Sequence, residues 1–327
     1  MKLKAPAFWY EKQHLFSNLL TPLSFLYEWG QKKHSRNQET FRASIPIICV
    51  GNLTVGGSGK TPCVQSLLEL IKDCQIAKNP CILSRGYGGT KNNHFVSEED
   101  TYHDVGDEPF LLSGIAPVMV AQNRAESAKL IAEKGHDMII MDDGYQNQQL
   151  YKDLSFLVVD GKVGFGNQKL LPAGPMRETL ESGLERASAL IIINEDSYGI
   201  RSLLPSSLPV FEAVIEPDRK NIRTEERYIG FCGIAHPQKF QRTIEAMSID
   251  LVELIDYPDH YNYSQQDITT LLNKAKNQDA RLVTTEKDYV RLLQYPELLS
   301  LLDTVPIKLK WQEENNVKAF LKERLTS

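Results

Sequence analysis

A lysine and a threonine close a glycine-rich turn in the stretch VGNLTVGGSGKTP, residues 50–62, directly behind the apolar run IPIICV. Glycines in such a turn let consecutive backbone N–H groups surround an anion, and the start of the following helix adds partial positive charge. Lys60 would reach the β- and γ-phosphates of a nucleotide, and the Thr61 hydroxyl would bind Mg²⁺. The pattern therefore predicts a P-loop, although Thr54 stands where the motif normally begins with glycine. A glycine turn before an ordinary helix is the plain alternative.

The residues that we expect to contact the nucleotide belong to this turn and its flanks. They are Asn52, Thr54, Val55, Gly56, Gly57, Ser58, Gly59, Lys60 and Thr61. Two classes of nucleotide-binding protein are disfavoured. GTPases read guanine with [NT]KxD, whereas TEKD at 285–288 has its lysine one position late, and partitioning ATPases carry a lysine where Val55 stands. A kinase and a non-enzymatic nucleotide-driven switch both remain open at this point.

Acidic residues that could assist phosphate chemistry occur at two further places. The apolar run in MIIMDDGYQ (138–146) ends in Asp142 and Asp143, as a Walker B strand does. Asp142 would hold Mg²⁺ directly or through water; Asp143 could be a second ligand or orient a water, or the pair could cap a helix. In VGDEPFLL (105–112), Asp107 or Glu108 could deprotonate an attacking hydroxyl or simply start a helix.

The elements that must position these residues follow from the pattern of apolar residues. Strands are expected at 45–50, 81–84, 118–121, 138–142, 156–160 and 190–194, with helices at 61–73, 124–134 and 178–186. Continuous apolar strands separated by helices indicate an α/β fold in which helices cover both faces of a parallel sheet. The sequence therefore predicts a P-loop NTPase-like sheet.

A cluster of proline, serine and glycine at 196–209 indicates a domain boundary. We expect a P-loop domain over 37–205 and a smaller α/β domain over 206–327. Strands of the smaller domain are expected at 210–215, 228–232, 251–255, 282–284 and 307–311, with helices near 237–247, 264–276 and 313–324.

The composition limits the partners of the chain. Its 327 residues carry a net charge of −5, so overall charge does not steer it toward nucleic acid. The five cysteines form no CxxC pair, which indicates reduced thiols in a cytosolic protein rather than a disulfide framework.

The first 36 residues contain an amphipathic segment. Plotted at about 100° per residue, its apolar side chains fall on one arc of roughly 140°. They are Phe8, Trp9, Leu15, Phe16, Leu19, Leu20, Leu23, Leu26 and Tyr27, and Lys32, Lys33 and Arg36 follow them. An apolar face closed by basic residues is typical of a helix in a membrane interface, and a helix packed on its own domain is the alternative. The uncharged part is shorter than the ~20 apolar residues that a spanning helix needs.

Eight motifs occur along the chain in the order VGNLTVGGSGKTP, SRGYGG, GDEP, DDGYQ, LLPAGPMRE, GIAHPQKF, YPDHYNYS and TEKDYVRL. This order resembles the tetraacyldisaccharide 4'-kinase family, the lipid A 4'-kinases of Gram-negative bacteria, over nearly the whole chain. The resemblance implies transfer of the γ-phosphoryl group of ATP to the 4'-hydroxyl of an acylated glucosamine disaccharide 1-phosphate, forming lipid IV A in lipopolysaccharide biosynthesis. It also implies ATP and Mg²⁺ as cofactors and peripheral attachment to the cytoplasmic face of the inner membrane. We expect a monomer with no nucleic-acid partner.

The motifs of the family also assign roles to individual residues. The resemblance makes Asp107 the catalytic carboxylate, working with His260 of the second domain, and adds Lys60 and Arg177 to the catalytic set. It places Thr61, Glu108 and Asp142 at the metal, and Tyr87, Asp143, Gln146 and Glu178 at the substrate. From the sequence alone His260 reads better as a surface histidine, and we expect TEKD to fix a strand end without chemistry. One departure is Asn147, where many members have histidine.

Overall fold

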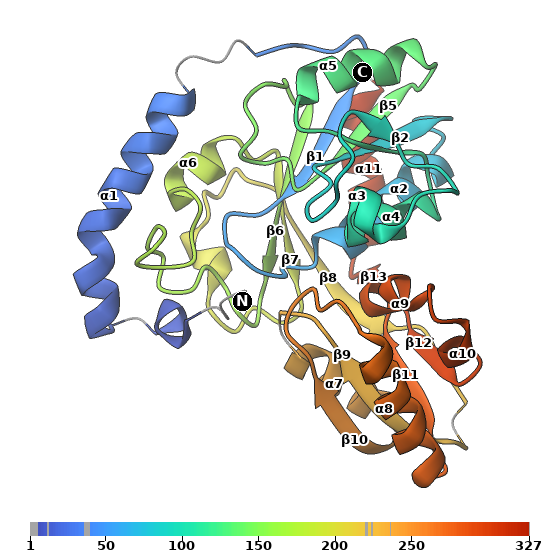
Figure 1. The fold of residues 1–327 in the computed structure, drawn as a ribbon. Helices are drawn as coiled ribbons and strands as arrows, with labels where there is room; N and C mark the ends of the chain where they lie inside the picture. The colour runs from blue at the N-terminus through green and yellow to red at the C-terminus, as the bar shows by residue number, and fades with distance from the viewer. Residues whose placement is uncertain are drawn as a thin grey trace.

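The computed structural model describes residues 6–11, 13–35, 40–219, 222–223, 225–235 and 237–326. Its large sheet has nine strands in the order β13-β8-β7-β6-β1-β5-β2-β4-β3 (Figure 1). These strands are β1 (Ile47–Gly51), β2 (Pro80–Ser84), β3 (His94–Phe95), β4 (Val118–Val120), β5 (Met138–Asp142), β6 (Leu154–Asp160), β7 (Ala189–Ile193), β8 (Val210–Pro217) and β13 (Ile307–Trp311). All pairs are parallel except those of β3 and β13, which are antiparallel at the two edges. The predicted α/β fold is confirmed.

Helices cover both faces of the large sheet. Alternate residues of β1 enter two separate cores: Ile48 and Val50 lie in one, and Ile47 and Cys49 lie in the other. This is why the strand reads as an unbroken apolar run. The first core is closed by α2 (Lys60–Asp73) and α11 (Glu314–Leu325), and the second by α5 (Arg124–Glu133) and α6 (Leu180–Glu185). The short helices α3 (Tyr102–Val105), α4 (Asp107–Ser113) and η2 (Ile200–Leu203) belong to the same unit.

A second sheet forms a smaller unit beside the large one. Its four parallel strands have the order β10-β9-β11-β12 and comprise β9 (Arg227–Cys232), β10 (Asp250–Asp256), β11 (Arg281–Thr285) and β12 (Leu302–Val305). Its helices are α7 (Pro237–Ala246), α8 (Gln265–Asn277), α9 (Glu286–Leu292) and α10 (Pro296–Leu299). Figure 1 shows α9 at the side of this unit that meets the large one.

The boundary predicted at residue 205 is wrong. Strand β8 pairs with β7 in the large sheet, and β13 returns to pair with β8 at Leu309↔Ile215. The Trp311 Nε1–H then donates to Ser66 Oγ of α2 at 2.8 Å, and α11 packs into the same core. The small unit is therefore an insertion between β8 and β13. The proline- and serine-rich stretch that suggested a boundary is a connection within the large sheet, between β7 and β8.

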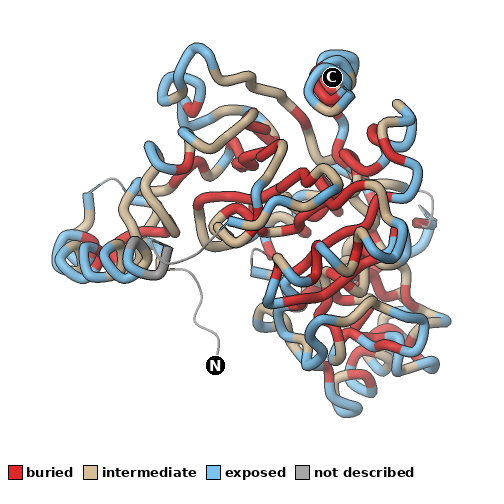
Figure 2. Tube along the Cα trace, turned by 90° about the horizontal axis from the view of Figure 1, so that it is seen from above, coloured by how far each residue is buried: buried red, intermediate tan, exposed pale blue. Residues whose placement is uncertain are grey.

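The N-terminal segment comprises η1 (Ala7–Tyr10) and α1 (Leu15–Ser35), which lies along one side of the molecule (Figure 1). The polar side of α1 faces the protein: Ser17 is 1% exposed and Ser24 is 7% exposed. Its apolar side faces outward, with Leu15, Phe16, Leu19, Leu23, Phe25, Leu26 and Trp29 all exposed, and most of the helix is pale blue in Figure 2. Within the described part of the chain, no helix has both the length and the apolarity to span a bilayer.

Candidate active site

The glycine-rich turn joins β1 to α2, as predicted. Gly56 and Gly59 adopt φ values of 120° and 86°, which glycine reaches without the penalty that a side chain would add. The first helical residue of α2 is Lys60, whose Nζ lies 3.4 Å from Asn52 Oδ1 and 3.7 Å from Asp143 Oδ1. The turn therefore directs its lysine toward the end of β5.

Other residues of the turn are held by the segment that precedes Arg177. The Val55 N–H donates to the Pro175 carbonyl at 2.9 Å, and Thr54 forms an isolated β-bridge with Met176. The Val55 amide is thus already bonded within the protein, so this residue supports the turn. By contrast, the buried Ser58 hydroxyl has no hydrogen-bond partner among the described residues.

The two acids at the end of β5 lie in opposite electrostatic environments. Asp142 is 1% exposed, and neither of its carboxylate oxygens has a hydrogen-bond partner within the described ranges. Burial first, then the charges of Glu108 and Asp143, raise its pKa to about 7. Burial also acts on Asp143, but Lys60 and Arg177 outweigh it and lower the pKa of that carboxyl. Arg177 donates to both Asp143 oxygens, at 3.0 and 3.4 Å.

The surroundings of Asp142 suit a bound Mg²⁺. An unpartnered buried carboxylate is costly unless a cation compensates it. The Thr61 side chain, 5% exposed at the start of α2, is the predicted hydroxyl ligand. Among the described residues no group of three His, Cys, Asp or Glu side chains could hold a metal by itself. Mg²⁺ in nucleotide sites takes waters and phosphate oxygens as ligands beside one or two carboxylates.

Mg²⁺ should therefore stabilise the nucleotide-free protein more at pH 8 than at pH 6. The pKa of Asp142 has an ordinary value of 3.8 and is raised to about 7 in the folded protein, so between these pH values the folded protein keeps a proton that the unfolded chain loses. The contribution of Asp142 to the free energy of unfolding is therefore lost as the pH rises from 3.8 to about 7. Above pH 7 the buried charge is present and a cation can relieve it. Thermal unfolding with and without Mg²⁺ measures the difference, and Asp142→Asn should abolish it. Equal stabilisation of the wild type at both pH values would contradict the assignment.

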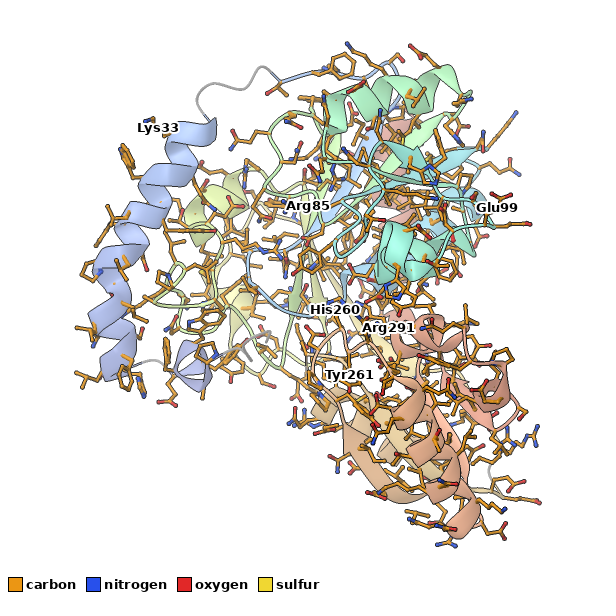
Figure 3. All side chains as sticks on the ribbon, in the orientation of Figure 1. Lys33, Arg85, Glu99, His260, Tyr261 and Arg291 are labelled. Carbon is orange, nitrogen blue, oxygen red and sulfur yellow. The ribbon has the colours of Figure 1, made fainter. Side chains whose placement is uncertain are left out.

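Asp107 is the first residue of α4 and contacts a histidine and an arginine of the small unit. The His260 Nδ1 lies 2.6 Å from Asp107 Oδ2, and the Arg291 guanidinium also donates to that oxygen. Burial raises the pKa of Asp107, but these hydrogen bonds and charges outweigh it and lower the pKa to about 2. Figure 3 shows His260 and Arg291 where the two units meet. The structure thus brings together the predicted pair, and His260 is not a free surface histidine.

Arg291 was not predicted, and it is firmly held. Its side chain is 1% exposed, and its Nη1 donates to Asp288 Oδ1 at 2.9 Å and to the Gly233 carbonyl at 3.1 Å. Asp288 in turn accepts hydrogen bonds from the Tyr263 hydroxyl and the Thr285 hydroxyl. The available signal was the i, i+3 spacing of Asp288 and Arg291 in TEKDYVRL, which places both on one face of a helix.

Two lysines of the small unit also reach the large one, and neither was predicted. Lys287 donates to Glu108, so this predicted metal ligand is already paired with a cation. Lys239 of α7 donates to the Gly57 carbonyl of the P-loop at 2.9 Å and to Asp160 Oδ2 at 2.5 Å. The expectation that TEKD only fixes a strand end is therefore too narrow, because its lysine contacts the acid beside Asp107.

The remaining predicted residues border the same site. The Gln146 side chain donates to Glu178 and to the Asn52 carbonyl, and it accepts from Arg177 at 3.3 Å. Tyr87 is exposed, with its ring centroid 5.9 Å from that of His260.

The side chain of Asn147, where many members of the family have histidine, folds back locally. Its amide donates to Gln149 Oε1 at 3.3 Å, and its Oδ1 accepts from the Gln149 N–H at 3.2 Å. Asn147 therefore bonds within its own turn in this structure.

Comparisons with known proteins agree with this geometry. The family model of tetraacyldisaccharide-1-P 4'-kinase matches residues 16–326. A tetraacyldisaccharide 4'-kinase of Rhodospirillum centenum is 38% identical over 98% of this chain and 96% of its own length, and one of Parvibaculum lavamentivorans is 40% identical over 90% and 88%. The LpxK protein of Aquifex aeolicus, solved in complex with ATP, is 28% identical, with a TM-score of 0.79 over 95% of this chain and all of its own. The resemblance stated above is confirmed: this chain belongs to the tetraacyldisaccharide-1-P 4'-kinase family.

Proposed function

We propose that this chain transfers the γ-phosphoryl group of ATP to the 4'-hydroxyl of tetraacyldisaccharide 1-phosphate, forming lipid IV A, with Asp107 as the proton acceptor. The observation that carries the proposal is the contact of Asp107 with His260 and Arg291 beside a P-loop. Relatives over the full chain carry the name of this activity, and the Aquifex aeolicus neighbour was solved with ATP.

The low pKa of Asp107 is compatible with its role. A pKa of about 2 keeps the Asp107 carboxylate ionised at any physiological pH, but it also makes this carboxylate a weak base. A loose phosphoryl-transfer transition state demands little early deprotonation of the acceptor hydroxyl. Asp107 can therefore accept the proton late, while His260 and Arg291 hold the carboxylate in place through Oδ2. Accurate placement of such a group is itself a large part of catalysis.

Cations around the P-loop would offset charge on the transferred group. Lys60 and Arg177 both contact Asp143, which holds them beside the P-loop. Preorganised charges of this kind are usually the largest catalytic contribution. When bound, Mg²⁺ would be held by Thr61 and Asp142 and would neutralise charge on the β- and γ-phosphate oxygens.

Closure of the two units is part of the proposed chemistry. The small unit supplies Lys239, His260, Lys287 and Arg291, and each contacts an acid of the large unit. With the units apart, Asp107 would lose both of its partners. A site that is complete only when closed limits transfer of the phosphoryl group to water.

We also propose that α1 attaches the protein peripherally to the cytoplasmic face of the inner membrane. Its outward side is apolar, and Lys33 beyond it is exposed, with its Nζ 5.3 Å from the Trp29 ring centroid. Of the predicted basic cluster, Arg36 and the side chain of Lys32 lie outside the described residues. An acylated substrate remains in the bilayer, so a helix with its apolar face outward suits the approach to it.

The triple variant Leu19→Ser/Leu23→Ser/Leu26→Ser should bind vesicles of anionic phospholipid at least about tenfold more weakly, because it removes apolar side chains from the outward side of the helix, which would enter the lipid. Sedimentation with vesicles measures this. The control is Leu293→Ser, which changes an exposed leucine in the small unit. Equal sedimentation of the triple variant and the wild type would rule out an interfacial role for α1.

The reaction itself is tested with γ-labelled ATP, Mg²⁺ and tetraacyldisaccharide 1-phosphate in detergent micelles. We expect label on the lipid, and none on the lipid when its 4'-hydroxyl is blocked. A soluble small-molecule kinase would instead leave the lipid unlabelled, and a nucleotide-driven switch would release label only as phosphate. Either result, obtained with protein that binds ATP, would overturn the proposed function.

A further inference from the structure

One segment of the large unit, residues 167–176, lies between α1 and the P-loop. On the side of α1, the Ser17 hydroxyl donates to the Ala173 carbonyl at 2.9 Å, and the Ser24 hydroxyl donates to the Leu170 carbonyl at 2.8 Å. The Trp9 indole N–H of η1 donates to the Pro172 carbonyl at 3.0 Å. The N-terminal segment thus holds three backbone carbonyls within four residues of this stretch.

The other end of the same segment holds the nucleotide loop. Pro175 accepts the Val55 N–H at 2.9 Å, and Met176 forms the β-bridge with Thr54. The next residue, Arg177, donates its N–H to the Leu53 carbonyl at 2.7 Å and its guanidinium to Asp143. The three carbonyls that accept from η1 and α1 therefore lie two to five residues before Pro175, whose carbonyl accepts from the P-loop.

The segment between these two sets of bonds is tightly packed. Ala173 and Met176 are 0% exposed. Asn167 donates to both the Ala173 carbonyl and the Ser17 hydroxyl, each at 3.0 Å. A Cβ added to Gly174 would lie 2.1 Å from Asn167 Oδ1, so the turn admits no side chain there. A well-packed interior transmits a displacement at one side to the other.

We propose that Trp9, Ser17 and Ser24 are positioning residues of the nucleotide site. The N-terminal helix then has two separate tasks on its two sides. Its apolar side meets lipid, and its polar side fixes the 167–176 segment, which sets the conformation of the P-loop and the direction of Arg177. Because coupling between two binding sites is reciprocal, lipid at α1 and nucleotide at the P-loop must change each other's affinity by the same factor. The inference rests on the proposed nucleotide site.

The two tasks predict opposite behaviour of two sets of variants in the N-terminal segment formed by η1 and α1. If α1 only attaches the protein to lipid, changes on its polar side should leave nucleotide binding unaltered. If it also positions the P-loop, the variant Trp9→Phe/Ser17→Ala/Ser24→Ala, named the polar-side variant below, should bind nucleotide more weakly even without lipid. These substitutions remove five hydrogen bonds: the three donated to the carbonyls at 170–173, and the two that the Ser17 and Ser24 hydroxyls accept from Asn167 and from the Ala173 N–H. They leave the exposed apolar side chains of α1 intact.

The experiment measures the Kd of a non-hydrolysable ATP analogue with Mg²⁺, using full-length protein in detergent without acceptor. We expect the polar-side variant to bind the analogue at least about fivefold more weakly than the wild type. The matched control, Leu19→Ser/Leu23→Ser/Leu26→Ser, should keep this Kd within about twofold while binding vesicles more weakly. Thermal unfolding checks that both are folded. Should Trp9→Phe/Ser17→Ala/Ser24→Ala not fold, Ser24→Ala alone should raise the Kd about threefold, beyond the change allowed to the control, since it removes two of the five bonds.

The outcomes separate the inference from the proposed function. A folded polar-side variant, or Ser24→Ala in its place, that binds the analogue as tightly as the wild type would overturn the inference alone. A wild-type protein that does not bind the analogue would overturn both. A reciprocal measurement adds a second check: saturating analogue should change the vesicle affinity of the wild type, and it should change that of the polar-side variant less.

Discussion

Replacing Asp107 with asparagine should lower kcat by about 10²–10⁴-fold and leave the KM for ATP within about threefold, because a general base acts on the transfer step and not on nucleotide binding. Asparagine keeps the shape of the side chain and can still accept from Arg291, but it cannot take the proton of the acceptor hydroxyl. The measurement is steady-state transfer of labelled phosphate to the lipid at saturating Mg²⁺.

A matched control for this variant is Asp104→Asn. Asp104 lies three residues earlier, where its carboxylate accepts from the backbone and side chain of Thr101. The Asp104→Asn variant therefore removes one carboxylate from the same stretch of chain but leaves the site unchanged. Its kcat should differ from that of the wild type by less than about twofold. If Asp107→Asn kept more than a tenth of the wild-type kcat, Asp107 would not be the base.

Replacing Arg291 with methionine should destabilise the protein by about 3–5 kcal/mol, since removing one partner of a buried ion pair leaves the other charge uncompensated. Here two acids lose their cation, because Arg291 contacts both Asp107 and Asp288, and Asp288 is 0% exposed. We also expect kcat to fall by about tenfold or more, because Asp107 loses one of the two groups that orient it. Chemical denaturation and the lipid-transfer assay measure these two effects.

Arg281→Met is the control for Arg291→Met. Arg281 is also an ion-paired arginine of the small unit, bonded to Asp303 through two hydrogen bonds, but this pair lies within that unit. Its loss should reduce stability without a specific loss of kcat. Arg291→Lys keeps the charge and should recover part of the activity. An Arg291→Met protein with the stability and kcat of Arg281→Met would show that Arg291 does not act on Asp107.

The parts of the site that depend on local signals could be predicted from the sequence. Strand β5 covers the predicted residues Met138–Asp142. A strand that is buried on both faces has an unbroken run of apolar residues in the sequence, and the two acids mark where this run ends. The P-loop is equally local, since its glycines, Lys60 and the start of α2 are neighbours in the chain. The domain limit could not be found in this way, because a proline-rich stretch marks a loop but not which sheet the next strand joins.

Contacts between the units could not be predicted from local patterns. His260 and Asp107 are 153 positions apart in the sequence, and only the resemblance to a family connected them. Lys239, Lys287 and Arg291 lie on helices of the small unit, where a basic residue reads as an ordinary solvated side chain. The orientation of α1 was also hidden, because an amphipathic pattern does not tell which side packs on the protein. Each of these features follows from how separate elements pack together.

The most direct test of the account is a crystal structure of the closed protein with a non-hydrolysable ATP analogue, Mg²⁺ and the disaccharide acceptor. The distance to measure joins an Asp107 carboxylate oxygen to the 4'-oxygen of the acceptor. We predict hydrogen-bond contact, about 2.6–3.2 Å, with the same hydroxyl facing the γ-phosphate held at Lys60. A closed complex in which Asp107 does not reach the 4'-oxygen, directly or through one water, would contradict the proposed chemistry.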